Sequence, residues 1–219
     1  MKTINFAERN TVLNQFVAEL RDVSVQSDRM RFRHNIRRIG HAMAYEMSKE
    51  LTYSEKQVRT PLDVASVSTP DDDIVLATVF RAGLPLHEAF LDVFDRAGNA
   101  FISAYRYYKD EACQELDVKV EYIASPMLDG KTLILVDPML ATGESFELAC
   151  KALFTKGRPA KIMLACIIAS PEGVAHLESL FPDDDVTLYC AAVDSHLNSR
   201  KYIVPGLGDA GDLSYGDKI

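Results

Sequence analysis

The sequence lacks any long apolar run. No window of its 219 residues approaches the ~20 consecutive apolar residues that a membrane helix needs. The first ten residues, MKTINFAERN, also lack the apolar core of a secretion signal. The composition, 47% hydrophobic and 26% charged, is typical of a globular protein with a sizeable core. We therefore expect a cytoplasmic protein that does not bind membranes.

Cysteine is scarce and widely spaced, at Cys113, Cys150, Cys166 and Cys190. The chain has no C-x-x-C pair, which makes a metal cluster an unfavourable interpretation. Three of the four cysteines lie in apolar segments that are expected to be helices or strands. We interpret all four as reduced structural residues.

Positive charge is also in deficit. The chain has 24 Lys and Arg residues and 32 Asp and Glu residues, which gives a net charge of −8. This balance argues against a broad nucleic-acid surface, although a small anion site can still be locally positive. The acidic runs at 71–73 and 183–185 each precede an apolar segment, and we interpret them as solvated turns.

The first fifty residues predict two helices. Apolar positions from Val12 to Leu20 follow helical spacing, and Ser27 is expected to cap a longer second helix. The apolar face of that helix consists of Phe32, Ile36, Ile39, Met43 and Met47. Its first half, RMRFRHNIRR at 29–38, is strongly basic. A solvated face is the favoured interpretation, and a site for an anionic effector or a neighbouring subunit is the alternative.

After Thr52 short apolar runs alternate with helical segments. Helices are expected after a glycine turn in GLPLHEAFLDVF, before a stop at Gly157, and from Pro171 onward. The apolar runs have the length of buried strands and read IVLATVF, AFISAYRYY, LILVD, KIMLACIIA and VTLYCAAVD. This alternation predicts an α/β fold with a central, mostly parallel sheet flanked by helices. The polar segment 108–120 interrupts the rhythm and is expected to form a projecting β-hairpin flap beside the site.

The motif LILVDPMLATGES, residues 133–145, lies where a strand passes into a helix. Ligands of parallel sheets bind at the carboxyl ends of the strands, and a helix N-terminus favours phosphate. Gly143 lets the main chain approach closely, while Asp137 suits sugar hydroxyls, directly or through magnesium. The loop has neither the Walker lysine nor G-x-G-x-x-G spacing, which disfavours a nucleoside triphosphate or a dinucleotide. A plain strand–helix connection is the alternative interpretation.

The C-terminal segment, DSHLNSRKYIVPGLGDAGDLSYG, has four glycines and one proline between positions 205 and 216. A disordered tail would have fewer aromatic and apolar residues, so we expect an ordered loop. Glycine-rich backbone suits a flat ligand that is recognised by main-chain N–H and C=O groups.

These motifs resemble those of a known family. VDPMLATG followed by a hydroxyl residue resembles the ribose-5-phosphate loop of type I phosphoribosyltransferases. The C-terminal segment closely resembles the uracil-binding hood of uracil phosphoribosyltransferases. With RAGL at 81–84 and YR at 105–106, the match covers most of the chain from about Ser27 onward. The resemblance implies one domain over 1–219, with N-terminal helices in 1–52, a flap at 108–120 and a hood at 194–219.

The resemblance implies a role for each matching residue. Asp137, Asp209 and Arg106 would be catalytic, and Asp209 would reach a Mg²⁺ ion through water. Uracil would be bound by Tyr202, Ile203, Gly208, Asp209 and Ala210, chiefly through the main chain of Ile203, Gly208 and Ala210. Phosphoribosyl pyrophosphate (PRPP) would be bound by Arg81, Arg106, Asp137, Pro138, Met139, Leu140, Ala141, Thr142, Gly143, Glu144, Ser145 and Asp209.

The implied reaction is uracil + PRPP → UMP + diphosphate, a step of pyrimidine salvage. None of the five histidines is given a role by the resemblance, and no side chain is an obvious general base. The resemblance also implies a homodimer or homotetramer and admits a GTP effector, because some members of the family respond to GTP.

The sequence departs from the family pattern at a few positions. Glu144 stands where typical members have a second glycine, and Lys201 stands where they have a glycine before Tyr-Ile. A carboxylate that pointed at a phosphate would be unfavourable, whereas one that pointed outward in the first turn of a helix would be mildly favourable. We expect Glu144 to point outward. RYYKDE at 106–111 also differs from the usual Arg-Asn-Glu.

These departures leave two alternatives to catalysis. One is a catalytically silent sensor of uracil or UMP that regulates a partner. The other is an RNA-binding attenuator on the same fold, which the negative net charge disfavours.

Overall fold

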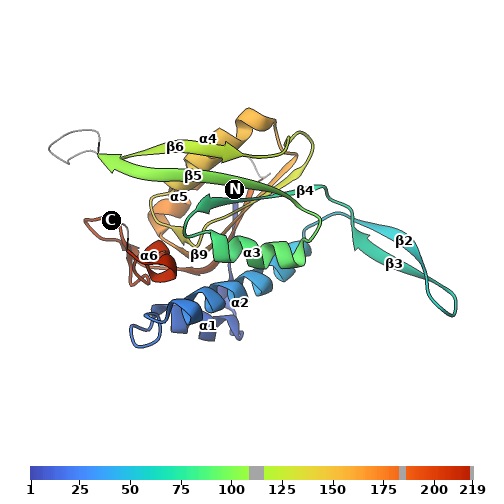
Figure 1. The fold of residues 1–219 in the computed structure, drawn as a ribbon, viewed down its shortest axis with the longest axis horizontal. Coiled ribbons are helices and arrows are strands. Elements are labelled where there is room, and N and C mark those ends of the chain that lie inside the picture. The colour runs from blue at the N-terminus through green and yellow to red at the C-terminus, as the bar shows by residue number, and fades with distance from the viewer. Residues whose placement is uncertain (109–115, 183–185, 218–219) are drawn as a thin grey trace.

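A mostly parallel β-sheet forms the centre of the protein (Figure 1). The computed structural model describes residues 1–108, 116–182 and 186–217. Within these residues the strands follow the order β1-β10-β9-β7-β4-β5-β6, and the short β8 also pairs with β9. Only the β5–β6 pair of this sheet is antiparallel. The expected α/β fold with a mostly parallel sheet is confirmed.

The predicted apolar runs form the strands in the middle of the sheet. Their bounds are β4 Ile74–Phe80, β5 Gly98–Tyr108, β7 Thr132–Val136, β9 Lys161–Ala169 and β10 Val186–Val193. Every residue of β7 is buried, which explains why its sequence is apolar without alternation. The remaining strands of the sheet are β1 Lys2–Asn5, β6 Leu116–Ala124 and β8 Met139–Leu140, and the sequence reasoning did not anticipate β1 or β8.

Helices cover both faces of the sheet (Figure 1). On one face lie α1 Leu13–Arg21, α2 Arg29–Ser48 and α3 Leu84–Val93, whose apolar side chains pack with those of β4 and β9. On the other face lie α4 Glu144–Leu153 and α5 Pro171–Leu180. Two short 3-10 helices, η1 Phe6–Glu8 and η2 Phe154–Lys156, complete these layers. The glycine stop expected at Gly157 ends η2, directly after α4.

Helix α2 differs from the prediction at its start. The apolar face is as expected, since Phe32, Ile36 and Met43 are buried. The capping residue is Asp28, however, and the prediction of Ser27 is wrong by one position. Asp28 Oδ1 accepts hydrogen bonds from the backbone N–H groups of Met30 and Arg31, at 2.9 and 3.0 Å. An aspartate at this position also places a negative charge against the positive end of the helix dipole.

An antiparallel hairpin that the sequence reasoning missed projects from the body of the protein (Figure 1). Strands β2 Tyr53–Arg59 and β3 Val64–Pro70 pair along their whole length, and we call this hairpin the arm. Nearly all of its residues are exposed, so neither face of the hairpin is buried. Its sequence therefore does not alternate between apolar and polar residues as that of a half-buried strand does. Leu62, in the turn, is 97% exposed.

The β-hairpin expected at 108–120 falls partly on residues that the structure describes. Strands β5 and β6 pair antiparallel up to Tyr108 opposite Leu116, as a hairpin requires. The residues between them, 109–115, lie outside the described part of the chain, and so does Cys113. The acidic run at 183–185 lies outside it as well.

The C-terminal segment folds over the carboxyl edge of the sheet. It consists of the paired strands β11 His196–Leu197 and β12 Ile203–Val204, followed by helix α6 Ala210–Tyr215. We call residues 194–217 the hood. Among the described helices of the protein, none has the length and apolar character to cross a membrane.

Candidate active site

The first half of the site is the loop that follows β7. This strand lies between β4 and β9, and its last residue, Val136, leads into Asp137 at the carboxyl edge of the sheet. The backbone N–H of Asp137 donates to Ala165 O at 3.1 Å, and Asp137 Oδ1 accepts from the backbone N–H of Met139 at 3.3 Å. These contacts fix the carboxylate where ligands of parallel sheets bind.

The loop continues through residues 141–143 into the N-terminus of α4. Gly143 has a φ of +87°, a conformation that favours glycine. A Cβ on Gly143 would also lie 2.7 Å from the ring of His176. Glu144, directly after Gly143, begins α4, so the backbone N–H groups of the first helical turn and the positive end of the helix dipole point towards the loop. The hydroxyl groups of Thr142 and Ser145 add polar groups to this phosphate cradle, residues 141–145.

Helix α5 supports the cradle from behind. Ser170, which caps α5, donates two hydrogen bonds to the loop: its backbone N–H donates to Leu140 O at 2.9 Å, and its hydroxyl donates to Ala141 O at 2.6 Å. A Cβ on Gly173 would lie 2.4 Å from Ala141 O. The sequence reasoning missed these supporting residues, although Ser170 before a proline is an N-cap signal.

A single cavity joins the cradle to the hood. Its volume is about 760 Å³. It is lined by the end of β4, by β5 at Ser103, by the loop after β7 with the start of α4, and by the hood. Of the residues predicted to bind substrate, it contains Arg81, Asp137, Met139, Leu140, Ala141, Thr142, Gly143, Ser145, Tyr202, Ile203, Gly208, Asp209 and Ala210. The sequence reasoning missed Val79, Phe80, Ala82, Ser103, Phe146, Gly211 and Asp217, which line it too.

Three predicted residues stand apart from this lining. Pro138 is buried in the turn after Asp137. Glu144 is not part of the lining, and its Oε1 lies 3.3 Å from Nζ of Lys201, which does line the cavity. The outward direction expected of Glu144 stays a prediction. Arg106 lies in β5 opposite Val118, and its side chain is outside the described part of the protein.

Arg81 stands at the mouth of the cavity, directly after β4. Its Nη2 donates to Asp212 Oδ1 at 2.8 Å and to Gly216 O at 3.2 Å. Its Nε is buried and has no hydrogen-bond partner among the described residues. The guanidinium thus connects the sheet to α6 through Nη2. Gly83 permits this turn, because a Cβ there would lie 2.1 Å from Thr78 Oγ1.

Asp209 caps helix α6. Its Oδ1 accepts from the backbone N–H groups of Gly211 and Asp212 at 2.8 and 3.0 Å. The carboxylate is thereby oriented within the cavity lining, and a structural role accompanies the predicted metal role.

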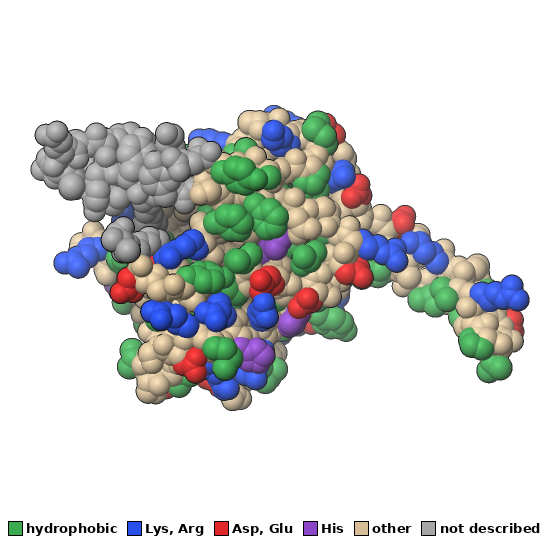
Figure 2. Space-filling model, viewed as in Figure 1, with side chains coloured by type: hydrophobic (Ala, Val, Ile, Leu, Met, Phe, Trp, Pro, Cys, Tyr) green, Lys and Arg blue, Asp and Glu red, His purple; other side chains and the backbone are tan. Residues whose placement is uncertain are grey.

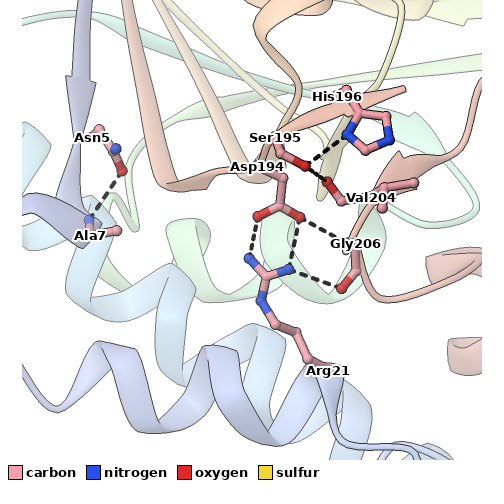
Figure 3. Close-up of polar contacts among 8 residues, drawn as sticks. All are labelled: Asn5, Ala7, Arg21, Asp194, Ser195, His196, Val204 and Gly206. Carbon is pink, nitrogen blue, oxygen red and sulfur yellow. Dashed lines mark hydrogen bonds and ion pairs between the residues drawn. The ribbon is translucent and has the colours of Figure 1, made fainter. Parts of the chain in front are cut away.

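A buried ion pair holds the hood to α1 (Figure 3). Arg21 donates to both carboxylate oxygens of Asp194, at 2.6 and 2.8 Å, and to Gly206 O at 2.9 Å. The backbone N–H of Gly206 donates to Asp194 Oδ2 at 2.8 Å, and the Asp194 side chain is only 4% exposed. Beside it, the Ser195 hydroxyl donates to Val204 O at 2.8 Å. This arrangement fixes the chain before the predicted uracil-binding residues of the hood, at Asp194, and between two of them, at Gly206.

The basic half of α2 is engaged in packing. Figure 2 shows Lys and Arg side chains gathered along this helix. Arg31 pairs with Glu19 at 2.8 Å, and Arg37 pairs with Glu88. Arg33 donates to Ser214 O at 2.6 Å and stacks over Tyr215 of the hood. The Arg31 and Arg37 side chains are about half-exposed, which is compatible with the favoured interpretation of a solvated face, and the Arg33 contacts tie α2 to the hood.

The cysteine thiols in the described part of the chain are buried and unsuited to nucleophilic chemistry. Cys150, Cys166 and Cys190 are buried and free. Burial raises the pKa of the Cys150 thiol to about 12, and burial also raises the pKa of Cys166 well above its usual range. These three side chains fill the core, as expected.

The carboxylates of the cavity fit a magnesium ion better than a closed metal centre. Among the described residues there is no group of three or more His, Cys, Asp or Glu side chains that could hold a metal. Mg²⁺ requires less, because it uses one or two carboxylates together with water and substrate phosphates. Asp137 and Asp209 both line the cavity and supply such oxygen atoms.

Comparison with known proteins gives a consistent result. The family model described as uracil phosphoribosyltransferase matches residues 7–216. A uracil phosphoribosyltransferase of Porphyromonas gingivalis is 52% identical over 219 residues, covering 100% of both chains. One of Thermococcus gammatolerans is 33% identical over 212 residues, covering 95% of this chain and 91% of the other.

Solved structures agree with the fold. A protein from Aquifex aeolicus matches with a TM-score of 0.86 at 29% identity, covering 99% of both chains. A hypoxanthine phosphoribosyltransferase from Staphylococcus aureus matches with a TM-score of 0.50 at 11% identity, covering 90% of this chain and 92% of that one. The second likeness concerns the fold alone.

We expect Arg21→Met to destabilise the protein and to loosen the hood. Removal of the guanidinium leaves the buried Asp194 carboxylate without its counter-ion, which costs about 3 kcal/mol. Chemical denaturation measures this loss. Arg31→Met is the matched control, since it removes an arginine from a more exposed ion pair and should have a much smaller effect. Equal losses for the two variants would contradict the importance of the Arg21–Asp194 pair.

Proposed function

The chain belongs to the uracil phosphoribosyltransferase family, and from that premise we propose how its site catalyses uracil + PRPP → UMP + diphosphate. The protein is a pentosyltransferase of pyrimidine salvage. The observation that carries the residue roles is the cavity in which the phosphate cradle, Asp137, Arg81 and the hood meet. Nothing in the comparisons favours the alternative of a silent regulatory homologue.

The cradle binds the 5-phosphate of PRPP in this proposal. Backbone N–H groups at the start of α4, the close approach allowed by Gly143, and the hydroxyl groups of Thr142 and Ser145 all suit a phosphate. Asp137, which precedes the cradle in the same loop, accepts hydrogen bonds from the ribose hydroxyl groups. Its oxygen is held towards the loop by the N–H of Met139.

Arg81 and Arg106 receive the diphosphate. A guanidinium group fits phosphate oxygens with two parallel hydrogen bonds. Arg81 is now bonded through Nη2 to Asp212, so the incoming diphosphate would compete with that carboxylate for the same N–H donors. The proposal for Arg106 rests on the sequence resemblance; Arg106 lies in β5, three residues after Ser103, which lines the cavity.

The hood binds uracil through its main chain. Gly208 has a φ of +97° and Gly206 a φ of +58°, so this backbone follows a path that residues with a Cβ rarely adopt. A Cβ on Gly206 would lie 2.2 Å from Ile203 O. The main chain of Ile203, Gly208 and Ala210 would then pair with the edge of the base, and the half-exposed Tyr202 would lie at its rim.

The chemistry consists mainly of positioning. N1 of uracil forms a bond to C1 of the ribose while the bond from C1 to the diphosphate oxygen breaks, and the N1 proton is released. The sugar gains oxocarbenium character, and the arginines stabilise the negative charge of the leaving group. Asp137 and Asp209 would hold Mg²⁺ together with the substrate, Asp209 through water. The chemistry that a bound Mg²⁺ supplies is neutralisation of charge on the diphosphate.

Assembly and regulation are further proposals. We propose a homodimer or homotetramer, which the arm supports, because Val58, Leu62 and Val64 are apolar and exposed on it. A cytoplasmic location is supported by the three free, buried cysteines. The GTP effector remains a prediction from the family resemblance.

Purified protein with uracil, PRPP and Mg²⁺ should form UMP and release diphosphate in equal amounts. Chromatography of the nucleotide and a coupled diphosphate assay measure the two products. Cytosine and hypoxanthine serve as control bases, and chelation of Mg²⁺ should abolish turnover. Absence of UMP from the reaction with uracil would contradict the proposal.

We expect Asp209→Asn to lower kcat/KM by on the order of 10- to 100-fold without lowering thermal stability. Asparagine caps a helix about as well as aspartate, so α6 should remain intact, whereas the negative charge needed near Mg²⁺ is lost. Kinetics at several Mg²⁺ concentrations and a melting curve separate the two roles. A large fall in melting temperature with unchanged kinetics would show that Asp209 has only a capping role.

The double substitution Leu62→Glu and Val64→Glu should shift the protein towards monomers. Charged residues on the arm would make it unfavourable to bury the arm against a second copy. Sedimentation velocity at micromolar concentration measures the change. Glu55→Gln, an exposed substitution on β2, is the control and should leave the assembly unchanged. An unaltered sedimentation coefficient in the double variant would exclude the arm from the interface.

A further inference from the structure

Glu144 and Lys201 lie 57 positions apart in the sequence and meet at the rim of the cavity. Glu144 is the first residue of α4 and one of the residues of the phosphate cradle, and Lys201 lies in the turn between β11 and β12 of the hood. Lys201 Nζ is 3.3 Å from Glu144 Oε1. This ion pair therefore connects the half of the site that holds the sugar phosphate to the half that holds the base.

Lys201 has a backbone conformation that is unfavourable for a residue with a side chain. Lys201 has a φ of +61° and is the only non-glycine residue with a positive φ in the described part of the chain. The turn is fixed by Asn198, whose side chain accepts from the backbone N–H groups of Arg200 and Tyr202. Glycine would adopt this conformation more easily, so the contribution of Lys201 must come from its side chain.

The charges at this place favour a role in phosphate binding. The Glu144 and Lys201 side chains are 40% and 47% exposed, so the ion pair contributes little to the stability of the fold. A sugar phosphate bound in the cradle would bring a third, strongly negative charge close to Glu144. Lys201, which lines the cavity together with Thr142, Gly143 and Ser145, neutralises that carboxylate.

We propose that Lys201 is a positioning residue for the phosphoribosyl substrate, which compensates the Glu144 carboxylate beside the cradle and joins the hood to it. This inference rests on the proposed function. It assigns to the pair an effect on the affinity for PRPP and UMP, which carry the 5-phosphate, and no effect on the affinity for uracil, which does not.

The test is a double-mutant cycle with Lys201→Asn and Glu144→Gln. Asparagine tolerates a positive φ, so Lys201→Asn removes the charge without forcing the turn to change. It should weaken UMP binding and raise the KM for PRPP roughly five- to tenfold, because Glu144 is left uncompensated, and change the KM for uracil less than about twofold. The double variant should return to within about twofold of the wild type. Calorimetry with UMP and steady-state kinetics give these values.

Two further variants isolate the charge of Lys201. Lys201→Arg should retain wild-type binding. Arg200→Asn removes the same charge from the neighbouring position of the turn and should change UMP binding less than about twofold. The effect of Lys201→Asn should also decrease at high salt.

Several results would overturn the inference. Equal weakening by Lys201→Asn with and without Glu144→Gln would mean that the two residues do not act together. If the main effect is on the KM for uracil, Lys201 acts on the base and not on the phosphoribosyl substrate. If no variant changes binding or KM, the ion pair is a surface contact without a role in substrate binding. If the wild type binds UMP but forms none, the proposed function fails and the cycle with UMP still decides this inference. If it binds neither UMP nor PRPP, both fail.

Discussion

The Asp194 carboxylate holds the hood half of the site in place. It stands at the end of β10 with its side chain 4% exposed, and it accepts two hydrogen bonds from Arg21 and one from the backbone N–H of Gly206. A buried carboxylate is costly unless such partners surround it, so the positions of α1, β10 and the glycine-rich loop constrain one another. The backbone around Gly206 and Gly208 carries the groups proposed to bind uracil, and its placement depends on this contact.

The other half of the site depends on the sheet itself. Parallel strands β4, β7 and β9 end at one edge, which brings the turn at Arg81 beside the loop at Asp137 although the two are 56 positions apart. The loop is then held by α5 in two ways. The Ser170 hydroxyl donates to Ala141 O, and at Gly173 there is no room for a side chain, because a Cβ would lie 2.4 Å from the same oxygen. The cavity is formed where this rigid edge meets the hood, so its shape depends on the sheet on one side and on the Arg21–Asp194 pair on the other.

The features that could be predicted from the sequence are the buried strands and the loops with a distinctive local sequence. The apolar runs that became β4, β7, β9 and β10 are buried on both faces, and the Asp137 loop was recognisable because strand, acid and glycine follow one another directly. The arm could not be found in this way, since its strands are exposed and contain few apolar residues in alternation. Arg21 was missed for another reason: its partner is 173 positions away, and nothing in its neighbourhood distinguishes it from a surface arginine.

Glu144 and Lys201 illustrate a related limit. Each residue, considered alone, departs unfavourably from the family pattern, one by placing a carboxylate beside a phosphate cradle and the other by placing a side chain where the backbone favours glycine. The structure puts the two opposite charges 3.3 Å apart, so the departures form a neutral pair at the rim of the cavity. A substitution at either position therefore has to be judged together with its partner, because the electrostatic field at the cradle depends on their sum. The Glu144→Gly change that would restore the family pattern in the loop would at the same time leave Lys201 as an unpaired cation at the rim, which is a different site from the one the family pattern describes.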